Sequence, residues 1–444
     1  MTDMRAVAKM MRELEDQLVL CMRCGMCQSV CPLYEQTGRE ADVARGKLAL
    51  LDGLMNEIFA DSKGTYERLN KCLLCGSCAA NCPSGVSAME IFLKARAILT
   101  GYMGLPKPKR IILRGMLSRP EIFDRVAEWG VSFQKIFSKP ASKVIGTSCG
   151  RIDNPLTAGR HFKPLARKPL HREIPSMDTR DQKTTLNAGF FIGCLIDKIF
   201  PEVGYATIKA LKHHEVGVFI PPGQGCCGIP ALSSGDLPSF EKLLIHNLSL
   251  YEKEDLDVLL TACATCTMTI REIWPKFAPS LSEKRLGILK NLCEKTMDVS
   301  EFLVKRAGVE AAQKTREEAV PVTYHDPCHL KKSLGIHKEP RIIIKSSQVY
   351  SLKEMSQPDK CCGMGGSFNL QYYEISRKIG KSKRDDIART GAKIVATGCP
   401  ACMSQISDML SSAGLKIAVK HPIELYAESL GDSLGRSSKE RDSS

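Results

Sequence analysis

The sequence lacks any long apolar run. Its 444 residues contain no uncharged apolar stretch of the ~18 residues that a membrane-spanning helix needs, so we expect no such helix. The apolar core of a secretory signal is also missing, because Arg12, Glu13 and Glu15 interrupt the N-terminal segment. We therefore expect a cytoplasmic protein in a reducing compartment, where structural disulfides are rare.

Motifs that bind nucleotide cofactors are missing too. No convincing Gly-x-Gly-x-x-Gly or Walker sequence occurs, and no Cys-x2-Cys pair is followed by the histidine that a c-type haem requires. A flavin or nicotinamide that oxidises an organic substrate is therefore expected on another chain. The hydrophobic fraction of 43% and the charged fraction of 25% predict a soluble chain of two to four folded domains.

What the sequence has in excess is cysteine. It contains 20 cysteines, eight of them before residue 101 and eleven between residues 187 and 430. In a reducing compartment, metal binding is the usual explanation for so many cysteines. Cys149 and Cys293 fall outside every pattern described below, and we interpret them as free thiols.

The first eight cysteines form two copies of one run, Cys-x2-Cys-x2-Cys-x3-Cys-Pro. This is the spacing of bacterial ferredoxins, in which the fourth cysteine of each run ligates the other cluster. The spacing predicts two cubane [4Fe–4S] clusters. One is ligated by Cys21, Cys24, Cys27 and Cys82, and the other by Cys31, Cys72, Cys75 and Cys78. Structural zinc needs only Cys-x2-Cys pairs and does not explain the third and fourth cysteines.

The later cysteines form an internal repeat. The first copy has Cys194, Cys226, Cys227, Cys263 and Cys266, and the second has Cys328, Cys361, Cys362, Cys399 and Cys402. Corresponding cysteines are 134 to 136 residues apart, which indicates two homologous units. Strands are expected at 189–193, 216–220 and 258–262 and at 322–325 and 394–398. Helices are expected at 201–213, 265–274 and 401–410. This alternation predicts α/β units with parallel sheets, in which sites gather at the carboxyl ends of the strands.

The repeats resemble the cysteine-rich CCG domains of heterodisulfide reductases, in which a cysteine precedes a vicinal pair and a Cys-x2-Cys pair follows. In that family such motifs bind a [4Fe–4S] cluster that is non-cubane in some members. The resemblance implies one or two further clusters, one on each set of five cysteines. Disulfides and zinc remain the alternatives from the residues alone.

The whole-chain order is similar to the iron–sulfur subunits of glycolate oxidase and D-lactate dehydrogenases. The local sequences Cys31-Pro32-Leu33-Tyr34, Ala44-Arg45-Gly46-Lys47 and Asn81-Cys82-Pro83-Ser84-Gly85-Val86 agree with it. The resemblance implies electron transfer from an FAD-dependent hydroxy-acid dehydrogenase subunit toward a quinone-reducing membrane partner or another carrier. Two alternatives stay open: a catalytic heterodisulfide-reductase-like subunit, and the iron–sulfur subunit of anaerobic glycerol-3-phosphate dehydrogenase. The enzymatic step itself is expected on another chain, so no catalytic residue is assigned here.

The fold class predicted is therefore multidomain, α+β with α/β parts. A helical two-cluster ferredoxin-like domain (1–102) is followed by a basic helical connector (103–186). Two homologous CCG repeats (187–310 and 311–430) and a disordered tail (431–444) complete the chain. The helices expected in the N-terminal part span 11–18 and 43–59.

The connector carries much of the net charge of +14, with 15 Lys/Arg against 6 Asp/Glu between residues 101 and 178. Such a segment suits an anionic membrane surface or an acidic partner, or is a solvated linker; we expect no nucleic-acid partner. An apolar stripe runs through Ile122, Val126, Trp129, Phe133 and Phe137. We expect it to pack on a neighbouring domain rather than to lie on a membrane, because Asp124, Glu128 and Gly130 interrupt it. Peripheral attachment to the cytoplasmic face of the membrane stays an alternative location.

Histidines near the second repeat have two interpretations. His325, Asp326 and His329 surround Cys328 and either form hydrogen bonds around a cluster or make a strand-end turn in which Asp326 caps a helix. We favour the turn, because the first repeat has no histidine there. The run Gly363–Gly366 is interpreted as backbone that makes room at the cluster, and His213 and His214 as a helix C-terminus.

Overall fold

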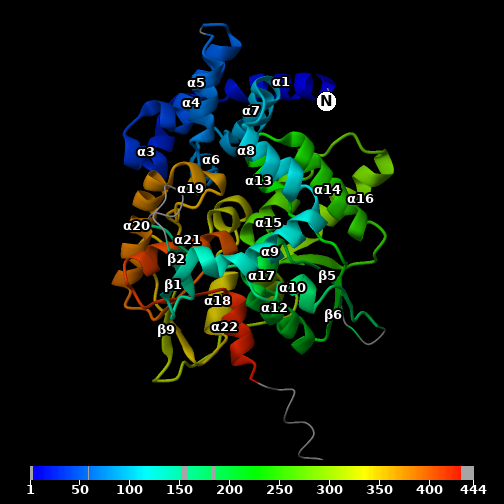
Figure 1. The fold of residues 1–444 in the computed structure, drawn as a ribbon, viewed down its shortest axis with the longest axis vertical. Helices are drawn as coiled ribbons and strands as arrows, with labels where there is room; N and C mark the ends of the chain where they lie inside the picture. The colour runs from blue at the N-terminus through cyan, green and yellow to red at the C-terminus, as the bar shows by residue number, and fades with distance from the viewer. Residues whose placement is uncertain (1–3, 59, 152–158, 182–183, 185, 432–444) are drawn as a thin grey trace, which may run out of the picture.

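The computed structural model describes residues 4–58, 60–151, 159–181, 184 and 186–431. It combines helices and sheets: a helical N-terminal region lies at one end, and two sheet-containing halves lie side by side beneath it (Figure 1). A continuous core of buried apolar side chains joins the three parts, from Leu69 and Phe92 to Phe190, Leu260 and Val395. Apart from Gly431, the predicted tail lies outside the described residues.

The N-terminal region is helical throughout. Its elements are α1 (Met4–Leu18), α2 (Met26–Ser29), α3 (Pro32–Thr37), the 3-10 turn η1 (Glu40–Asp42), α4 (Ala44–Met55), α5 (Ser62–Asn70), α6 (Ser77–Ala80) and α7 (Ala88–Met103). The helix expected to reach residue 59 ends earlier, at Met55. Asn56 follows in a non-helical conformation and Glu57 has a φ of 55°, which stops the helix.

The first half contains a five-stranded sheet in the order β4-β6-β5-β7-β8. Its strands are β4 (Met177–Asp178), β5 (Leu186–Phe191), β6 (Val216–Ile220), β7 (Val258–Thr261) and β8 (Thr296–Asp298), and only β4 pairs antiparallel. The helices are α11 (Cys194–Lys198), α12 (Pro201–His213), α13 (Ile229–Ser233), α14 (Leu237–Tyr251), α15 (Ala264–Met268), the π-helical turn η3 (Thr269–Ile273), α16 (Glu283–Glu294) and α17 (Val299–Lys305). The predicted β6 and α12 are confirmed with the expected bounds, whereas the helix expected over 265–274 divides into α15 and η3.

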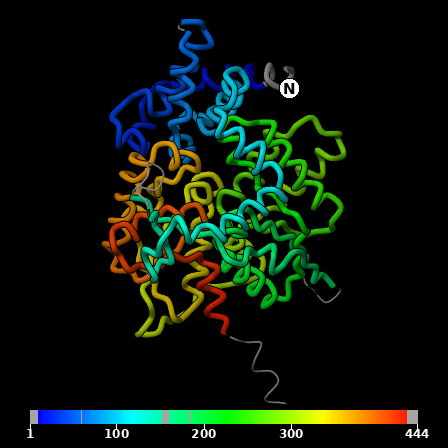
Figure 2. Tube along the Cα trace, viewed as in Figure 1, coloured from blue at the N-terminus to red at the C-terminus, as the bar shows by residue number. Residues whose placement is uncertain are grey.

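The second half contains a four-stranded parallel sheet in the order β10-β9-β11-β12. Its strands are β9 (Val320–Tyr324), β10 (Tyr350–Leu352), β11 (Ile394–Ala396) and β12 (Ala418–Lys420). The helices are η4 (His329–Ser333, π-helical), α18 (Glu339–Lys345), α19 (Ser367–Gln371), α20 (Tyr373–Arg389), α21 (Pro400–Ser412) and α22 (Pro422–Ser429). The last helix, α22, crosses to the first half and lies against α12 (Figure 2), where His214 Nε2 and the Tyr426 hydroxyl are 2.8 Å apart.

The connector is partly helical and partly strand. It contains α8 (Lys107–Arg110), the π-helical segment η2 (Ile111–Leu117), α9 (Pro120–Phe137), α10 (Leu170–Glu173) and an antiparallel sheet of β1 (Ser138–Ser142), β2 (Thr147–Gly150) and β3 (His161–Phe162). Helix α9 runs across the surface of the molecule (Figure 1).

The apolar stripe of α9 does not pack on a neighbouring domain as predicted. Only Ile122 is half-buried, whereas the other four side chains are exposed, with Trp129 at 71% and Phe137 at 65% of full exposure. The acidic residues that seemed to interrupt the stripe point inward instead. Asp124 binds Lys198 at 2.7 Å and Glu128 contacts His171 at 3.2 Å, while Gly130 leaves room for Leu165, whose methyl carbon a Cβ there would approach to 2.8 Å.

The inward face of α9 depends on the protonation of His171. Its Nδ1 lies 2.9 Å from Asp197, and this hydrogen bond raises the pKa of His171 against the opposing effect of burial. Asp124, Glu128 and Lys198 complete the cluster. Because the pKa of His171 is higher in the folded state than the ~6.5 of an unfolded histidine, its stabilisation is fully present below pH ~6.5. It is lost as the pH rises through the folded-state pKa.

We therefore expect α9 to be better protected from amide hydrogen exchange at pH 6 than at pH 8, after correction for intrinsic exchange rates. The variant His171→Gln should show no such difference, whereas the control His213→Gln should keep it. Equal protection of α9 at both pH values in the unsubstituted protein would contradict this prediction.

Candidate metal centres

The first cysteine run surrounds a cavity near the surface. Cys21, Cys24 and Cys27 line it together with Cys82 of the second run, and its volume is about 400 Å³ including the part open to solvent. The chain wraps this cavity tightly, because Arg23 and Gly25 both have positive φ, 54° and 87°. A Cβ at Gly25 would lie 3.0 Å from the Arg45 guanidinium, so the turn favours glycine for both conformation and space.

The second run surrounds a deeper cavity of about 440 Å³. Cys31 of the first run joins Cys72, Cys75 and Cys78 around it. The backbone repeats the first turn, with Leu74 and Gly76 at φ 54° and 71°. The structure thus brings together the same crossed sets of four cysteines that the ferredoxin spacing predicts, although Cys78 also borders the first cavity.

Both cavities fit an iron–sulfur cluster. Each offers four sulfur donors, and burial raises the pKa of the Cys31 thiol to about 11 and that of Cys78 well above its usual value. Thiolates at these positions thus need nearby positive charge, which iron ions supply. The protein adds two buried cations beside the deeper cavity. Lys47 donates a hydrogen bond to the Asp42 carbonyl, and Arg96 donates to the Cys72 carbonyl at 2.9 Å.

The first CCG-like set gathers at the carboxyl ends of β5 and β7. Cys194 begins α11 after β5, and Cys263 precedes α15 after β7. Cys194 Sγ lies 3.8 Å from Cys226 Sγ, and hydrogen bonds from Cys226 and Cys266 lower the pKa of Cys227. Cys263 hydrogen-bonds Cys266, so the side chains of all five cysteines predicted for the first repeat lie together.

The second set repeats this arrangement. Cys362 Sγ lies 3.4 Å from Cys402 Sγ, and hydrogen bonds from Cys361 and Cys402 lower the pKa of Cys362. Cys328 hydrogen-bonds Cys361, which raises the pKa of Cys328. Cys399 completes the set through its hydrogen bond with Cys402.

The backbone at the two sets is nearly identical in conformation. Cys263 and Cys399 have φ and ψ of −143°, 109° and −142°, 112°. The glycines after the two vicinal pairs, Gly228 and Gly363, have φ of 96° and 92°, and a Cβ at either would collide with a neighbour at 2.7 or 2.6 Å. The vicinal pair is thus followed by a turn that only glycine fits.

The two CCG-like sets meet directly. The Cys263 thiol hydrogen-bonds Cys399 and lowers the pKa of Cys399. The Thr265 hydroxyl lies 3.5 Å from Cys399 Sγ, and the Ala264 amide donates to the Gly398 carbonyl at 2.9 Å. Sequence reasoning did not predict this contact, since nothing in the repeat fixes how its copies face each other.

The deeper ferredoxin-like cavity also touches the second set. Cys75 hydrogen-bonds Cys361, and this bond together with burial raises the pKa of Cys75 well above its usual value. His329 Nε2 lies 3.0 Å from the Leu74 carbonyl, and Lys332 donates to the Ser77 hydroxyl at 2.6 Å. Sulfur contacts therefore continue from Cys75 through the second set to the first.

The structure agrees with some of the other residue predictions made from the sequence and contradicts one of them. Asp326 does not cap a helix as predicted; it accepts two hydrogen bonds from the Arg341 guanidinium at 2.8 and 3.0 Å. His213 ends α12, as predicted. Gly365 has a positive φ, and a Cβ there would lie 3.1 Å from Leu73 Cα, so this glycine makes room for the N-terminal region.

Comparison with known families agrees with this geometry. Residues 17–86 match the family described as 4Fe-4S dicluster domain, and residues 188–271 and 322–407 match the cysteine-rich domain family CCG. The chain contains a 4Fe-4S dicluster domain and two CCG domains. It is an iron–sulfur protein, and we use these domain names from here on.

The relatives of this chain carry names that differ in function. The chain is 27% identical over 430 residues to the probable glycolate oxidase iron-sulfur subunit of Bacillus subtilis, covering 94% of this chain and 95% of that one. It is 25% identical over 442 residues to one subunit of the dihydromethanophenazine:CoB–CoM heterodisulfide reductase of Methanosarcina barkeri, covering 94% of each. It is also 28% identical over 242 residues to lactate utilization protein A of B. subtilis, covering 54% of this chain and 98% of that one.

A solved structure shares the fold. The crystal structure of a hypothetical protein from Helicobacter pylori matches 97% of this chain and 77% of its own chain with a TM-score of 0.52 at 9% identity. At that identity the likeness concerns the fold alone.

Proposed function

We propose that the chain is the iron–sulfur electron-transfer subunit of a flavin-dependent 2-hydroxy acid dehydrogenase complex that oxidises glycolate or D-lactate. An FAD-bearing partner supplies the electrons, and a quinone or another carrier receives them. The observation that carries the proposal is the unbroken series of cysteine contacts from Cys75 to Cys194, with the first dicluster cavity beside it. The named glycolate and lactate relatives support the substrate class.

The cavities support a ligand assignment for each cluster. We assign Cys21, Cys24, Cys27 and Cys82 to one cubane [4Fe–4S] cluster and Cys31, Cys72, Cys75 and Cys78 to the other. Each CCG domain holds a further cluster on its five cysteines. When bound, each cluster would carry one electron at a time, and the chain's residues hold the four sulfur sets side by side.

We also propose the finer architecture. Residues 187–310 and 311–430 form homologous α/β units, and both sheets, the matching φ and ψ angles and the matched glycines support this. The domain limits drawn from the sequence stay predictions.

The experiment that tests the function is anaerobic capture of the tagged full-length chain from its native cells. We expect a flavoprotein to be recovered with it and the visible absorbance of the complex to bleach on addition of glycolate or D-lactate. Glycerol 3-phosphate serves as the control substrate and should leave the absorbance unchanged. The proposal would be contradicted if the captured chain carried no flavoprotein. It would also be contradicted if glycerol 3-phosphate bleached the complex and neither glycolate nor D-lactate did.

The contact between Cys263 and Cys399 favours a second candidate, a catalytic disulfide reductase. Two sulfur sets that face each other could act on one disulfide from both sides, and a heterodisulfide reductase subunit is among the full-length relatives. The discriminating result is reoxidation of the dithionite-bleached chain by an organic disulfide at a rate that exceeds the rate of a buffer control.

The outer face of α9, made of Val126, Trp129, Phe133, Ile136 and Phe137, suggests where the protein attaches to the membrane. All five side chains are more than 40% exposed, and Ile111 and Ile112 of the adjoining η2 are exposed too. Exposed cations stand on α9 and on the segments that precede and follow it along the chain: Lys107, Arg110, Arg119, Arg125, Lys135, Lys139 and Lys143. In the described chain no helix is long and apolar enough to cross a membrane.

An aromatic face bordered by cations is typical of a helix that lies in the interface of an anionic bilayer. We propose that the outer face of α9 holds the protein at the cytoplasmic face of the membrane. Two of the three acidic residues of α9, Asp124 and Glu128, are paired inward with Lys198 and His171. The third, Glu121, is exposed at the start of the helix and lies 3.7 Å from the Arg125 guanidinium.

We expect the purified chain to sediment with vesicles of phosphatidylcholine and phosphatidylserine, and less with phosphatidylcholine alone. The double variant Trp129→Glu/Phe133→Glu should lower the bound fraction about tenfold, because it removes apolar burial and adds repulsion from the anionic surface. The control Leu370→Glu changes an exposed leucine elsewhere and should bind normally. Binding of the double variant at the unsubstituted level, or no binding by the unsubstituted chain, would indicate that a partner protein covers this face instead.

A further inference from the structure

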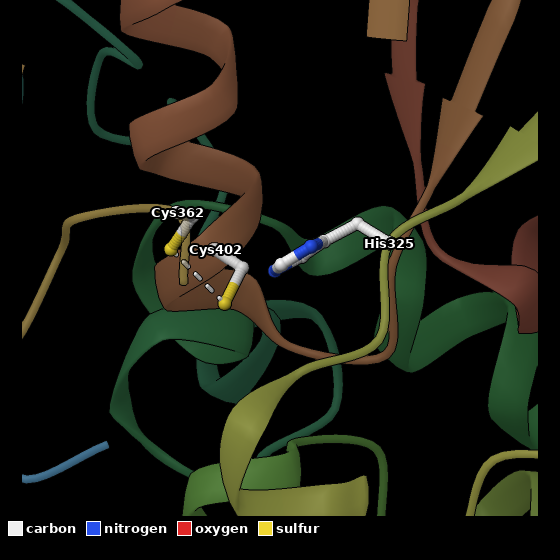
Figure 3. Close-up of side chains that lie close together, drawn as sticks. All are labelled: His325, Cys362 and Cys402. Carbon is white, nitrogen blue, oxygen red and sulfur yellow. Dashed lines mark hydrogen bonds between the residues drawn. The ribbon is translucent and has the colours of Figure 1, made fainter. Parts of the chain in front are cut away.

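The second CCG domain contains a buried imidazole beside its cysteine sulfurs. His325 follows β9, and its side chain is 1% exposed. Its ring points toward the sulfurs of Cys362 and Cys402 (Figure 3). One ring nitrogen and these two sulfur atoms all lie within 4.8 Å of one another, which is close enough to bind one metal ion.

The hydrogen bonding of the ring determines which nitrogen is free. Nδ1 lies 3.1 Å from the Pro358 carbonyl, which can only accept, so Nδ1 carries the hydrogen. Nε2 then has a bare lone pair, and it has no hydrogen-bond partner among the described residues. A histidine whose one nitrogen donates to a carbonyl while the other points into a metal site is the usual arrangement of a ligating histidine.

The other histidine of this region is oriented differently. His421 is fully buried, and its Nε2 also has no hydrogen-bond partner among the described residues. Its Nδ1 accepts the Ile423 amide at 3.2 Å, so the hydrogen is on Nε2, which therefore cannot ligate a metal in this tautomer. Of the two buried imidazoles, only His325 presents a lone pair to the sulfurs.

The first CCG domain has no counterpart of this nitrogen. The residue 134 positions earlier is Phe191, whose ring packs edge-on against Trp274 with centroids 6.3 Å apart. The two domains match in their cysteines and their glycine turns but differ at this position. Any property that depends on the imidazole is therefore confined to the second domain.

We propose that His325 Nε2 is an iron ligand of the second CCG centre, beside Cys362 and Cys402. The two CCG centres are thus unequal: the first has sulfur ligands alone, and the second has mixed nitrogen and sulfur ligands. Because imidazole is neutral and thiolate is anionic, nitrogen ligation raises the reduction potential of a centre, as it does when histidine replaces cysteine in other iron–sulfur proteins. This inference rests on the proposed function only in requiring that the second CCG domain binds iron.

The test is pulsed electron paramagnetic resonance on the anaerobically purified, reduced full-length chain, prepared with natural-abundance histidine and with ¹⁵N-histidine. We expect the isotope to change the hyperfine pattern of the unsubstituted chain. It should have no effect in His325→Phe, which copies the first domain, or in His325→Cys, which supplies a thiolate instead. The control His246→Phe changes a half-buried histidine of α14 in the first CCG domain and should keep the isotope effect. His325→Cys should also lower the midpoint potential of one centre only.

The outcomes separate this inference from the proposed function. If Cys362→Ser/Cys402→Ser has the same iron content as the unsubstituted chain, the second domain binds no iron, and the proposed function and this inference both fail. If iron is lost in that variant but ¹⁵N-histidine leaves the spectrum of the unsubstituted chain unchanged, His325 is not a ligand and only this inference fails. Persistence of the isotope effect in His325→Phe would overturn it as well. The labelling comparison uses the unsubstituted chain, so it decides the question even where a variant does not fold.

Discussion

Replacing Cys31 and Cys24 together is expected to remove both cubane clusters, whereas replacing Cys31 and Cys75 together removes only one. Cys31 precedes the second run by about 40 residues, yet it lines the cavity of Cys72, Cys75 and Cys78. Replacing any one cysteine of a set with serine should therefore cause loss of the same cluster, which contains about 4 iron atoms. Two such replacements within one set should cause no more iron loss than one replacement. Two replacements in different sets should cause the loss of about 8 iron atoms.

Iron and sulfide analysis of the anaerobically purified variants measures this directly. The matched pair Cys82→Ser/Cys24→Ser should behave like Cys31→Ser/Cys75→Ser, because Cys82 lines the first cavity. Cys149→Ser is the control, since Cys149 lies in β2 and belongs to none of the four sets. If Cys31→Ser/Cys24→Ser lost no more iron than either single variant, each run would ligate its own cluster and the crossed assignment would be wrong.

Replacing Arg96 with methionine is expected to destabilise the protein by about 3–9 kcal/mol. Arg96 is 3% exposed and donates to three carbonyls: Leu69 at 3.1 Å, Cys72 at 2.9 Å and Ser233 at 2.6 Å. Leu69 and Cys72 lie in the dicluster domain, whereas Ser233 is the last residue of α13 in the first CCG domain. Methionine fills similar space but leaves three buried acceptors without a donor, at a cost of roughly 1–3 kcal/mol each where water cannot reach them.

Urea unfolding of the anaerobic holoprotein, followed by circular dichroism and by visible absorbance, measures this loss. Arg96→Lys keeps the charge but cannot reach all three carbonyls, so its midpoint should fall between those of the other two proteins. Arg39→Met replaces an exposed arginine of the same domain and should leave the midpoint unchanged. An Arg96→Met midpoint equal to that of the unsubstituted protein would show that water satisfies the carbonyls and that Arg96 does not hold the domains together.

The local features were predictable from sequence because local chemistry determines them. The residues of 201–213 themselves show an apolar helix face and a helix end, and α12 has those bounds (Pro201–His213). The two ferredoxin-like runs fix their turns through glycine at matching positions, so the crossed cysteine sets could be predicted as well. The repeat spacing predicted which five cysteines gather in each CCG domain.

The features that depend on distant contacts could not be predicted. The periodicity of α9 shows that one face is apolar but not which face is exposed, because the inward ion pairs are formed with His171 and Lys198, 43 to 74 residues away. The contact of Cys263 with Cys399 depends on how two homologous units pack. The orientation of His325 depends on the Pro358 carbonyl, which lies in another loop.

The central claim is that the dicluster domain and both CCG domains form one electron-transfer unit. The most direct test is rapid-freeze electron paramagnetic resonance of the captured flavoprotein complex, mixed anaerobically with its 2-hydroxy acid. Our account predicts that signals from the dicluster clusters and from the CCG centres both appear within a single turnover. Reduction of the dicluster clusters alone, with the CCG centres unchanged over many turnovers, would contradict it.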